Sequence, residues 1–168
     1  LLMSGGLGTM GYGLPGAIGA KIGNPDTPVV SISGDGGMQM NIQELATAVL
    51  EELPIISCIF NNNNLGMVRQ WQKLFYGKRY SMTCLHSGAA CRGKCGEVEC
   101  PPYTPDFIRL AESYGVKGIR VTKKEDIEPA FREAMKTPYI IEFEIDPEDL
   151  VYPMVEPGGT LRDLIMDC

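Results

Sequence analysis

The chain has 168 residues, 44% of them apolar, and a formal net charge of −6. This length suits one globular domain with a substantial core and is too short for two. The negative charge argues against binding to nucleic acid or to an anionic membrane, because phosphate groups would be repelled. The longest apolar stretches have the length of strands, and the N-terminus carries no secretion signal. We therefore expect a cytoplasmic protein in which any phosphate site is local.

Glycine recurs through residues 5–23. Small residues at this density predict a tight loop that leads into a helix packed closely against a neighbouring backbone. The loop also matches the G-x-G-x-x-G fingerprint of a nicotinamide-binding turn. That interpretation lacks support, because no strand precedes the loop and no strand ending in an acid follows at the right distance. Because the chain enters this loop almost at its start, without an initiator methionine, we expect it to be excised from a longer protein.

Two buried parallel strands are predicted at residues 29–33 and 54–60, which are short, apolar and bounded by proline or glycine. Between them, apolar residues recur at helical spacing over residues 42–50. Asn41 and Glu44 have the form of a capping box that would begin this helix of about three turns. A strand, a crossover helix and a second strand form a right-handed βαβ unit, so the carboxyl ends of both strands face the same edge.

Asp35 lies just past the first of these strands, and Asn62 lies in a run of four asparagines after the second. Ligands bind outside the carboxyl ends of strands in open α/β sheets. A carboxylate and an amide oxygen are hard ligands that suit Mg²⁺ when substrate phosphates complete the coordination. Gly36 and Gly37 lack a Cβ, so backbone amides there can approach phosphate oxygens. Each half alone is typical of an ordinary turn, but together they predict a diphosphate held through a metal.

The second half of the chain continues the alternation of helices and strands. We expect helices at 105–115 and 129–136 and strands at 116–121 and 139–145. The last strand is expected to be less buried, because polar residues alternate along it after an apolar start. The chain is therefore predicted to be a doubly wound α/β domain, with a mainly parallel sheet and helices on both faces.

The span from Asp35 to Asn62 resembles the thiamin diphosphate motif. Three longer segments narrow the resemblance: residues 4–15, 39–48 and 64–72, the last of which contains a Met-Val-x-Gln-Trp sequence. Together they resemble the catalytic subunit of acetolactate synthase (acetohydroxyacid synthase), and the likeness covers nearly the whole chain. The resemblance implies that residues 1–168 are the C-terminal thiamin-diphosphate-binding domain of such an enzyme, with the thiamin-diphosphate-binding fold.

The resemblance implies a metal and diphosphate site at the strand ends. Asp35 and Asn62 would bind Mg²⁺ through side-chain oxygens, and Asn64 would add its backbone carbonyl. Gly36 and Gly37 would contact the diphosphate of the cofactor.

The rest of the cofactor would be held by the glycine-rich loop and by residues 64–72. The carbonyl of Gly8 would accept from the aminopyrimidine, and Met10 would impose the bent conformation of the cofactor. Met67 and Trp71 would line the pocket over the thiazolium and the substrate entrance, although such residues more often serve packing. Because the cofactor acts as its own base, no catalytic acid or base is expected in this chain, whose only histidine is His86.

The implied reaction decarboxylates pyruvate and joins the product to a second 2-keto acid, in branched-chain amino-acid biosynthesis. The resemblance implies a homodimer or tetramer of subunits of the same type and is compatible with a regulatory subunit. The activating glutamate would come from the N-terminal domain of a partner subunit, and the FAD-binding middle domain also lies outside these residues. We therefore expect this polypeptide alone to be inactive.

Residues 82–103 depart from the family pattern and form a cysteine-rich insertion with Cys84, Cys91, Cys95 and Cys100. Cys91, Cys95 and Cys100 are not at a standard zinc spacing, although Cys84 or His86 can complete a set of four ligands. A disulfide or redox pair is a second interpretation. A plain surface insertion is favoured, because cysteines in reducing cytosol usually stay free thiols.

Two other functions stay open at this stage. The first is another thiamin-diphosphate-dependent enzyme, either a 2-keto acid decarboxylase or the β chain of a split enzyme. Such an enzyme would differ from acetolactate synthase at residues 67–71. The second is a non-catalytic domain that binds a cofactor or a partner subunit.

Overall fold

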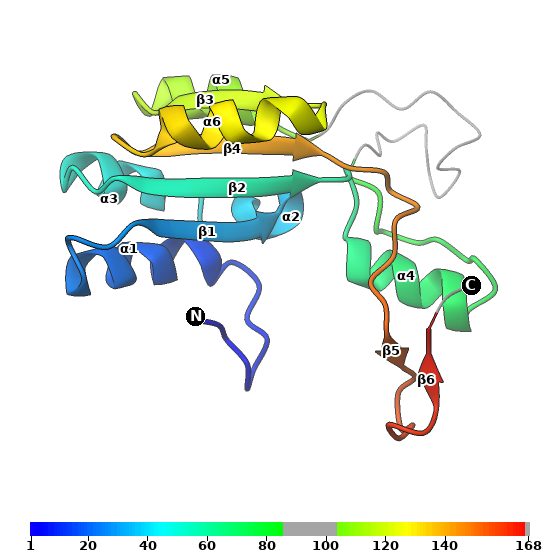
Figure 1. Ribbon diagram of the computed structural model, residues 1–168. Coiled ribbons are helices and arrows are strands. Elements are labelled where there is room, and N and C mark those ends of the chain that lie inside the picture. The colour runs from blue at the N-terminus through cyan, green and yellow to red at the C-terminus, as the bar shows by residue number, and fades with distance from the viewer. Residues whose placement is uncertain (86–103, 167–168) are drawn as a thin grey trace.

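The computed structural model describes residues 1–85 and 104–166, which fold around a four-stranded sheet. Neighbouring strands run parallel in the order β1-β2-β4-β3, so their carboxyl ends point the same way (Figure 1). The strands are β1 (Val29–Gly34), β2 (Ile55–Asn61), β3 (Lys117–Val121) and β4 (Tyr139–Glu144). The predicted mainly parallel sheet is confirmed, and each strand lies close to its predicted bounds.

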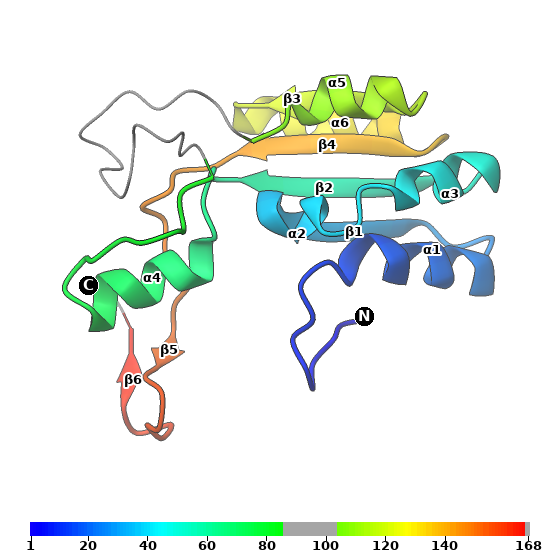
Figure 2. The ribbon, with the colours of Figure 1, turned by 180° about the vertical axis from the view of Figure 1, so that it is seen from behind.

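Helices cover both faces of the sheet, as Figures 1 and 2 show from opposite sides. Side chains of β2 explain the division, because consecutive strand residues point to opposite faces. Ile55 and Ile59 face one set of helices, and Ile56 and Cys58 face the other. The first face carries α1 (Gly13–Gly23), α2 (Asp35–Gln39), α3 (Glu44–Leu50) and α5 (Phe107–Ser113); the second carries α6 (Ile127–Ala134), preceded by the 3-10 turn η1 (Lys124–Asp126).

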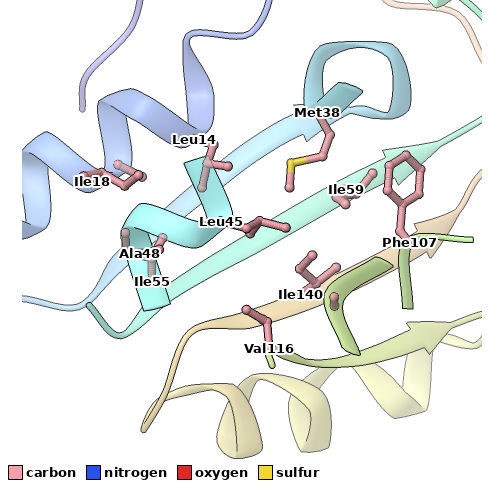
Figure 3. Close-up of a cluster of buried hydrophobic side chains, with 12 residues drawn as sticks. Leu14, Ile18, Met38, Leu45, Ala48, Ile55, Ile59, Phe107, Val116 and Ile140 are labelled. Carbon is pink, nitrogen blue, oxygen red and sulfur yellow. The ribbon is translucent and has the colours of Figure 1, made fainter. Parts of the chain in front are cut away.

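The larger core lies between the first set of helices and the sheet (Figure 3). Leu45 of α3 and Phe107 of α5 pack there with Ile59 of β2 and Ile140 of β4. All four side chains are at most 2% exposed, and burial of each contributes about 1.5–3 kcal/mol. This core holds β2 and β4 in register and thereby fixes where the turns after the strands begin.

The glycine-rich start of α1 packs closely on β1, as predicted. A Cβ on Gly13 would lie 3.0 Å from the Ser31 hydroxyl oxygen and 3.5 Å from the Ile32 carbonyl oxygen. Glycine therefore favours this approach of helix to strand, because any side chain at position 13 would crowd the Ser31 hydroxyl.

The prediction of a less buried strand at 139–145 is wrong. β4 lies inside the sheet, between β2 and β3, and Tyr139 to Glu142 are all buried. The alternation of charge is misleading because Glu142 is only 1% exposed and forms an ion pair with Arg120 of β3. Only Glu144, the last residue of the strand, is exposed.

The predicted capping box is also wrong. α3 begins at Glu44, its N-cap Gln43 makes no side-chain capping bond, and the helix has seven residues rather than three turns. Asn41 instead donates from Nδ2 to the carbonyl of Gly11 at 3.0 Å. The amide of Asn41 therefore fastens the glycine-rich loop, a contact 30 residues distant in sequence that local spacing does not reveal.

Helix α4 (Gly66–Phe75) lies beyond the carboxyl ends of the strands rather than on a face of the sheet (Figure 1). The C-terminal arm, residues 145–166, runs beside it and contains the short antiparallel pair β5 (Met154–Val155) and β6 (Leu164–Ile165). Gln70 of α4 is 1% exposed and joins the two. Its Nε2 donates to the Val151 carbonyl at 2.8 Å, and its Oε1 accepts from the Val151 N–H at 2.9 Å.

Candidate functional site

Asp35 lies at the junction of β1 and α2 and is 2% exposed. Its Oδ1 accepts a hydrogen bond from the backbone N–H of Gly36 at 2.7 Å. Its Oδ2 is buried and has no hydrogen-bond partner among the described residues. Burial raises the pKa of the Asp35 carboxyl, while the backbone N–H groups of Gly36, Asn63 and Asn64 act in the opposite direction. The site thus contains a buried acid with one oxygen unused, close to the asparagine run.

The asparagine turn, residues 61–64, is held by its own side chains. Asn61 Oδ1 accepts from the N–H of Asn63 at 3.0 Å, and Asn62 Oδ1 accepts from the N–H of Asn64 at 2.9 Å. Asn64 Nδ2 donates back to the carbonyl of Asn62 at 2.8 Å. Asn63 has a φ of 57°, in the left-handed region that asparagine tolerates better than most residues. Its own hydrogen bonds therefore fix the turn, and the backbone N–H groups of Asn63 and Asn64 lie close to the Asp35 carboxylate.

These groups match the chemistry of a hard cation. Asp35 supplies a carboxylate, and the asparagine turn supplies amide and carbonyl oxygens, which are the ligands that Mg²⁺ takes together with phosphates. A buried carboxylate oxygen without a partner is costly in free energy. A bound cation would offset that cost, so the residues present fit a divalent metal.

An open cavity of about 720 Å³ lies next to Asp35 and is lined by the N-terminal loop (residues 1–12), α1, β1, the start of α2 and residues 64–66. Its volume falls within the range of cofactor and ligand sites. The residues named from the sequence that line it are Gly8, Met10, Asp35, Gly36, Gly37 and Asn64. The structure therefore brings six of the predicted site residues around one cavity.

Glycine at position 36 leaves room for two side-chain ends beside this cavity. A Cβ there would lie 2.8 Å from Leu65 Cδ2 and 2.9 Å from Met10 Cε. The absence of a side chain at Gly36 thus lets Met10 approach the backbone next to Asp35.

Three predicted residues do not line this cavity. Asn62 lies two residues before Asn64, the first residue of the turn that lines the cavity, and its side-chain oxygen accepts from the N–H of Asn64. Met67 and Trp71 lie on α4 and are 50% and 37% exposed. Trp71 packs edge-on against Phe75, with ring centroids 6.2 Å apart. The part of α4 that reaches the cavity is its first residue, Gly66.

Sequence reasoning missed the residues that support the asparagine turn. Asn61 donates from Nδ2 to Glu142 Oε1 at 2.7 Å, and Arg120 Nε donates to Glu142 Oε2 at 2.9 Å. One signal was available, since Glu142 shares the strand face of Ile140 and so falls on a core-facing position. A buried carboxylate needs partners, but the sequence does not name them.

The cysteine-rich insertion at 82–103 is described only as far as residue 85. Cys84 forms an isolated antiparallel bridge with Asn64, supported by the N–H of Leu65 donating to the Thr83 carbonyl at 2.8 Å. Cys91, Cys95 and Cys100, with His86, lie outside the described residues. Within residues 1–85 and 104–166, no group of three or more His, Cys, Asp or Glu side chains is arranged to hold a metal ion. In the same part of the chain, no helix has the length and apolar character needed to cross a membrane.

Comparison with known proteins gives relatives over nearly the whole chain. It is 47% identical over 166 residues to a probable acetolactate synthase large subunit of Methanococcus aeolicus, covering 98% of this chain and 25% of the relative. It is 48% identical to the acetolactate synthase large subunit of Corynebacterium glutamicum, covering 97% and 25%. The chain thus spans about a quarter of the length of these relatives.

The fold also matches a solved structure, the thiamine diphosphate-dependent 4-hydroxybenzoylformate decarboxylase of Rhodococcus jostii. The match has a TM-score of 0.67 and 30% sequence identity, and it covers 82% of this chain and 23% of the decarboxylase. Residues 1–143 match the family described as thiamine pyrophosphate enzyme, C-terminal TPP binding domain. This match includes the N-terminal loop, Asp35 and the asparagine turn. The chain belongs to the thiamine pyrophosphate enzyme family, as a C-terminal TPP binding domain.

Proposed function

We propose that the chain is the thiamin-diphosphate- and Mg²⁺-binding part of an acetolactate synthase, which decarboxylates pyruvate and joins the product to a second 2-keto acid. The observation that carries the proposal is the unused buried oxygen of Asp35, placed between a glycine-lined cavity and the asparagine turn. The similarity to acetolactate synthase large subunits supports this choice among members of the family. The branched-chain amino-acid pathway follows from that choice.

The metal would be held at the strand ends. Asp35 and Asn62 would supply side-chain oxygens and Asn64 its backbone carbonyl, while Gly36 and Gly37 leave room for the diphosphate oxygens. Burial of Asp35 strengthens its attraction to a cation, because few waters compete with it. The metal would thereby bind the acidic end of the cofactor to a protein that is itself negatively charged.

The remainder of the cofactor would lie along the N-terminal loop. Gly8 has a φ of 59°, which glycine adopts without strain, and its carbonyl would accept from the aminopyrimidine. Met10 would lie under the cofactor and hold it bent. When bound, thiamin diphosphate supplies the nucleophilic carbon and the electron sink for loss of CO₂.

Met67 and Trp71 would form an apolar wall at the substrate entrance. Both are partly exposed on α4, so closure of this wall would require α4, or a segment beyond these residues, to cover the site. An apolar wall would exclude water from the carboxylate of pyruvate and favour its loss as CO₂.

The chain would act as part of a larger assembly. An activating glutamate would be supplied by the N-terminal domain of a second subunit of the same type, in a homodimer or tetramer, and FAD would bind elsewhere in the full-length enzyme. We expect the isolated 168-residue polypeptide to form no acetolactate from pyruvate with thiamin diphosphate, Mg²⁺ and FAD present. Formation of acetolactate by this polypeptide would contradict that expectation.

Calorimetry on the full-length protein tests the binding function. Thiamin diphosphate should bind saturably when Mg²⁺ is present and bind far more weakly after chelation with EDTA, because the diphosphate is held through the metal. Binding that ignores Mg²⁺, or no binding at all, would overturn the proposal.

A second candidate is a 2-keto acid decarboxylase, which the solved neighbour favours. The two candidates differ in product. With pyruvate as the sole substrate, a synthase releases acetolactate, whereas a simple decarboxylase releases acetaldehyde. Product analysis by mass spectrometry therefore decides between them.

A further inference from the structure

A buried ionic contact lies behind the asparagine turn, on the side away from Asp35. Glu142 of β4 is 1% exposed, and both of its oxygens are engaged. Oε1 accepts from Asn61 Nδ2 at 2.7 Å, and Oε2 accepts from Arg120 Nε at 2.9 Å. Arg120 supplies the positive charge that a buried carboxylate needs, since an unpaired one is strongly destabilising.

This contact determines which way the amide of Asn61 points. An ionised carboxylate only accepts hydrogen bonds, so the NH₂ end of Asn61 must face Glu142. The oxygen of the same amide is then left to accept from the N–H of Asn63 at 3.0 Å. With the amide reversed, both contacts would be lost, because oxygen would meet oxygen and donor would meet donor.

The orientation of the Asn61 amide decides whether the asparagine turn can close. The hydrogen bond to the N–H of Asn63 closes a turn in which Asn63 has a φ of 57°, and the next residue, Asn64, bonds to Asn62. The backbone of Asn61 is also bonded to the residue that follows β4, because its carbonyl accepts from the N–H of Ile145 at 3.0 Å. One side-chain contact with β4 and one main-chain contact with the residue after it therefore hold the turn in position.

We propose that Glu142, paired with Arg120, is a positioning residue for the metal-binding turn and acts through the side-chain amide of Asn61. The proposal rests on the proposed function, because it assigns these residues to the support of a Mg²⁺ site. Glu142 does not line the cavity. It fixes the amide that closes the turn carrying Asn62 and Asn64.

The test is Mg²⁺ affinity in the full-length protein, titrated with thiamin diphosphate in excess. In Glu142→Gln one oxygen becomes an NH₂ group, so either Asn61 or Arg120 faces a donor where it needs an acceptor. Residues that orient metal ligands typically cost 10- to 100-fold in metal affinity when replaced, and we expect Mg²⁺ to bind about 10-fold or more weakly.

Glu144→Gln is the matched control. Glu144 lies two residues along the same strand and also pairs with Arg120, at 3.4 Å, but its side chain is 54% exposed. Glu144 is the register partner of Asn61 in the sheet, but the Asn61 side chain bonds to Glu142 and not to Glu144 among the described contacts. Mg²⁺ affinity should stay within about twofold of wild type in this control, because exposed ion pairs contribute little.

The route through Asn61 gives a sharper test. Asn61→Ala should weaken Mg²⁺ binding, and adding Glu142→Gln to it should cause no further loss, because the amide on which Glu142 acts is gone. Losses that simply add would overturn the proposal. Unfolding midpoints of the metal-free variants, measured alongside, separate positioning from stability, since a purely structural role lowers the midpoint and leaves affinity at a lower temperature unchanged.

The outcomes are distinguishable from failure of the proposed function. If wild-type protein binds no Mg²⁺ and thiamin diphosphate, the proposed function is wrong. If wild type binds both and Glu142→Gln binds Mg²⁺ with unchanged affinity, the positioning role is wrong and the function stands. If Glu142→Gln does not fold, Asn61→Ala, which leaves the ion pair intact, decides by the same criterion.

Discussion

The turns that follow β1 and β2 differ sharply, although they start from equivalent places. Gly34 and Phe60 are register partners in the sheet, and Asp35 and Asn61 are the residues that follow this pair. After β1 the chain enters α2 at once, and Asp35 keeps one buried oxygen without a partner among the described residues. After β2 the chain forms a turn closed by three hydrogen bonds from its own asparagines.

The difference teaches that the two halves of the site have separate physical tasks. The residue after β1 provides a buried carboxylate that is only partly satisfied, because Oδ2 of Asp35 has no hydrogen-bond partner among the described residues, and this is unfavourable without a bound cation. The turn after β2 provides neutral oxygens whose positions are fixed beforehand, so little ordering is needed on binding. Changes on the β1 side should therefore affect binding more than stability, whereas changes on the β2 side should lower stability as well.

The largest effect is expected from Asp35→Asn. Removing the charge should weaken Mg²⁺-dependent binding of thiamin diphosphate by at least about 100-fold, beyond the range for residues that only support a ligand. The metal-free variant should not unfold more easily than wild type, because it loses a buried charge with an unused oxygen. Asp26→Asn, an exposed acid in the turn before β1, is the control and should bind as wild type does.

The pH dependence of stability tests the effect of burying Asp35. Burial raises the pKa of Asp35 in the folded, metal-free protein. Its favourable contribution is therefore complete at pH values below its unfolded pKa and is lost as the pH rises through the folded pKa. Urea unfolding in EDTA should show wild type losing stability relative to Asp35→Asn over that interval. A constant difference between the two proteins would contradict the role of burial.

The next effect concerns α4, the helix after the asparagine turn, and its contact with the C-terminal arm. Gln70→Ala removes both hydrogen bonds to the Val151 backbone and should destabilise the protein by about 2 kcal/mol, within the usual cost of unsatisfied buried groups. Amide hydrogen exchange should rise first in residues 145–166. Val68→Ala, an exposed position on the same helix, should leave exchange there unchanged. Equal exchange in both variants would show that Gln70 does not hold the arm.

On the β1 side, Gly36→Ala should affect binding with little loss of stability. The added Cβ meets the ends of Met10 and Leu65, which are flexible and can move. Displacing Met10 from the cavity should weaken thiamin diphosphate binding by about 10-fold, or about 1.4 kcal/mol. Gly19→Ala in α1, where a Cβ would meet nothing within 4 Å, is the control and should be neutral or slightly stabilising. A large drop in the unfolding midpoint of Gly36→Ala would show that the backbone, not Met10, had moved.

Local patterns predicted most of the fold and the charged half of the site. Apolar runs bounded by glycine and proline predicted all four strands of the sheet, and the crossover rule placed Asp35 and the asparagine turn at one edge. These features depend on neighbours within a few residues or on the handedness of one βαβ unit. The sequence could therefore name Asp35 and the residues beside it.

Contacts between distant segments could not be predicted in the same way. Glu142 and Asn61 are 81 residues apart, and their hydrogen bond depends on β4 inserting between β2 and β3. Without that strand order, the charges of β4 are typical of an exposed strand, which is why its burial was mispredicted. Asn41 shows the same limit, because a residue suited to capping α3 was used to fasten the glycine-rich loop.

The smallest predicted effect tests whether the turn after β2 is fixed by its backbone. Asn63 has a φ of 57°, and alanine in that conformation costs about 1 kcal/mol more than asparagine or glycine. Asn63→Ala should therefore lower the free energy of unfolding by about that amount, while Asn63→Gly should be nearly neutral. Both keep the N–H that donates to Asn61, so Mg²⁺ affinity should change by less than about threefold, far less than in Asn61→Ala. Equal losses of stability for alanine and glycine, measured by urea unfolding, would mean that the Asn63 side chain, rather than the left-handed backbone, holds the turn. In that case the fixed geometry of this half of the site would depend on side-chain contacts alone.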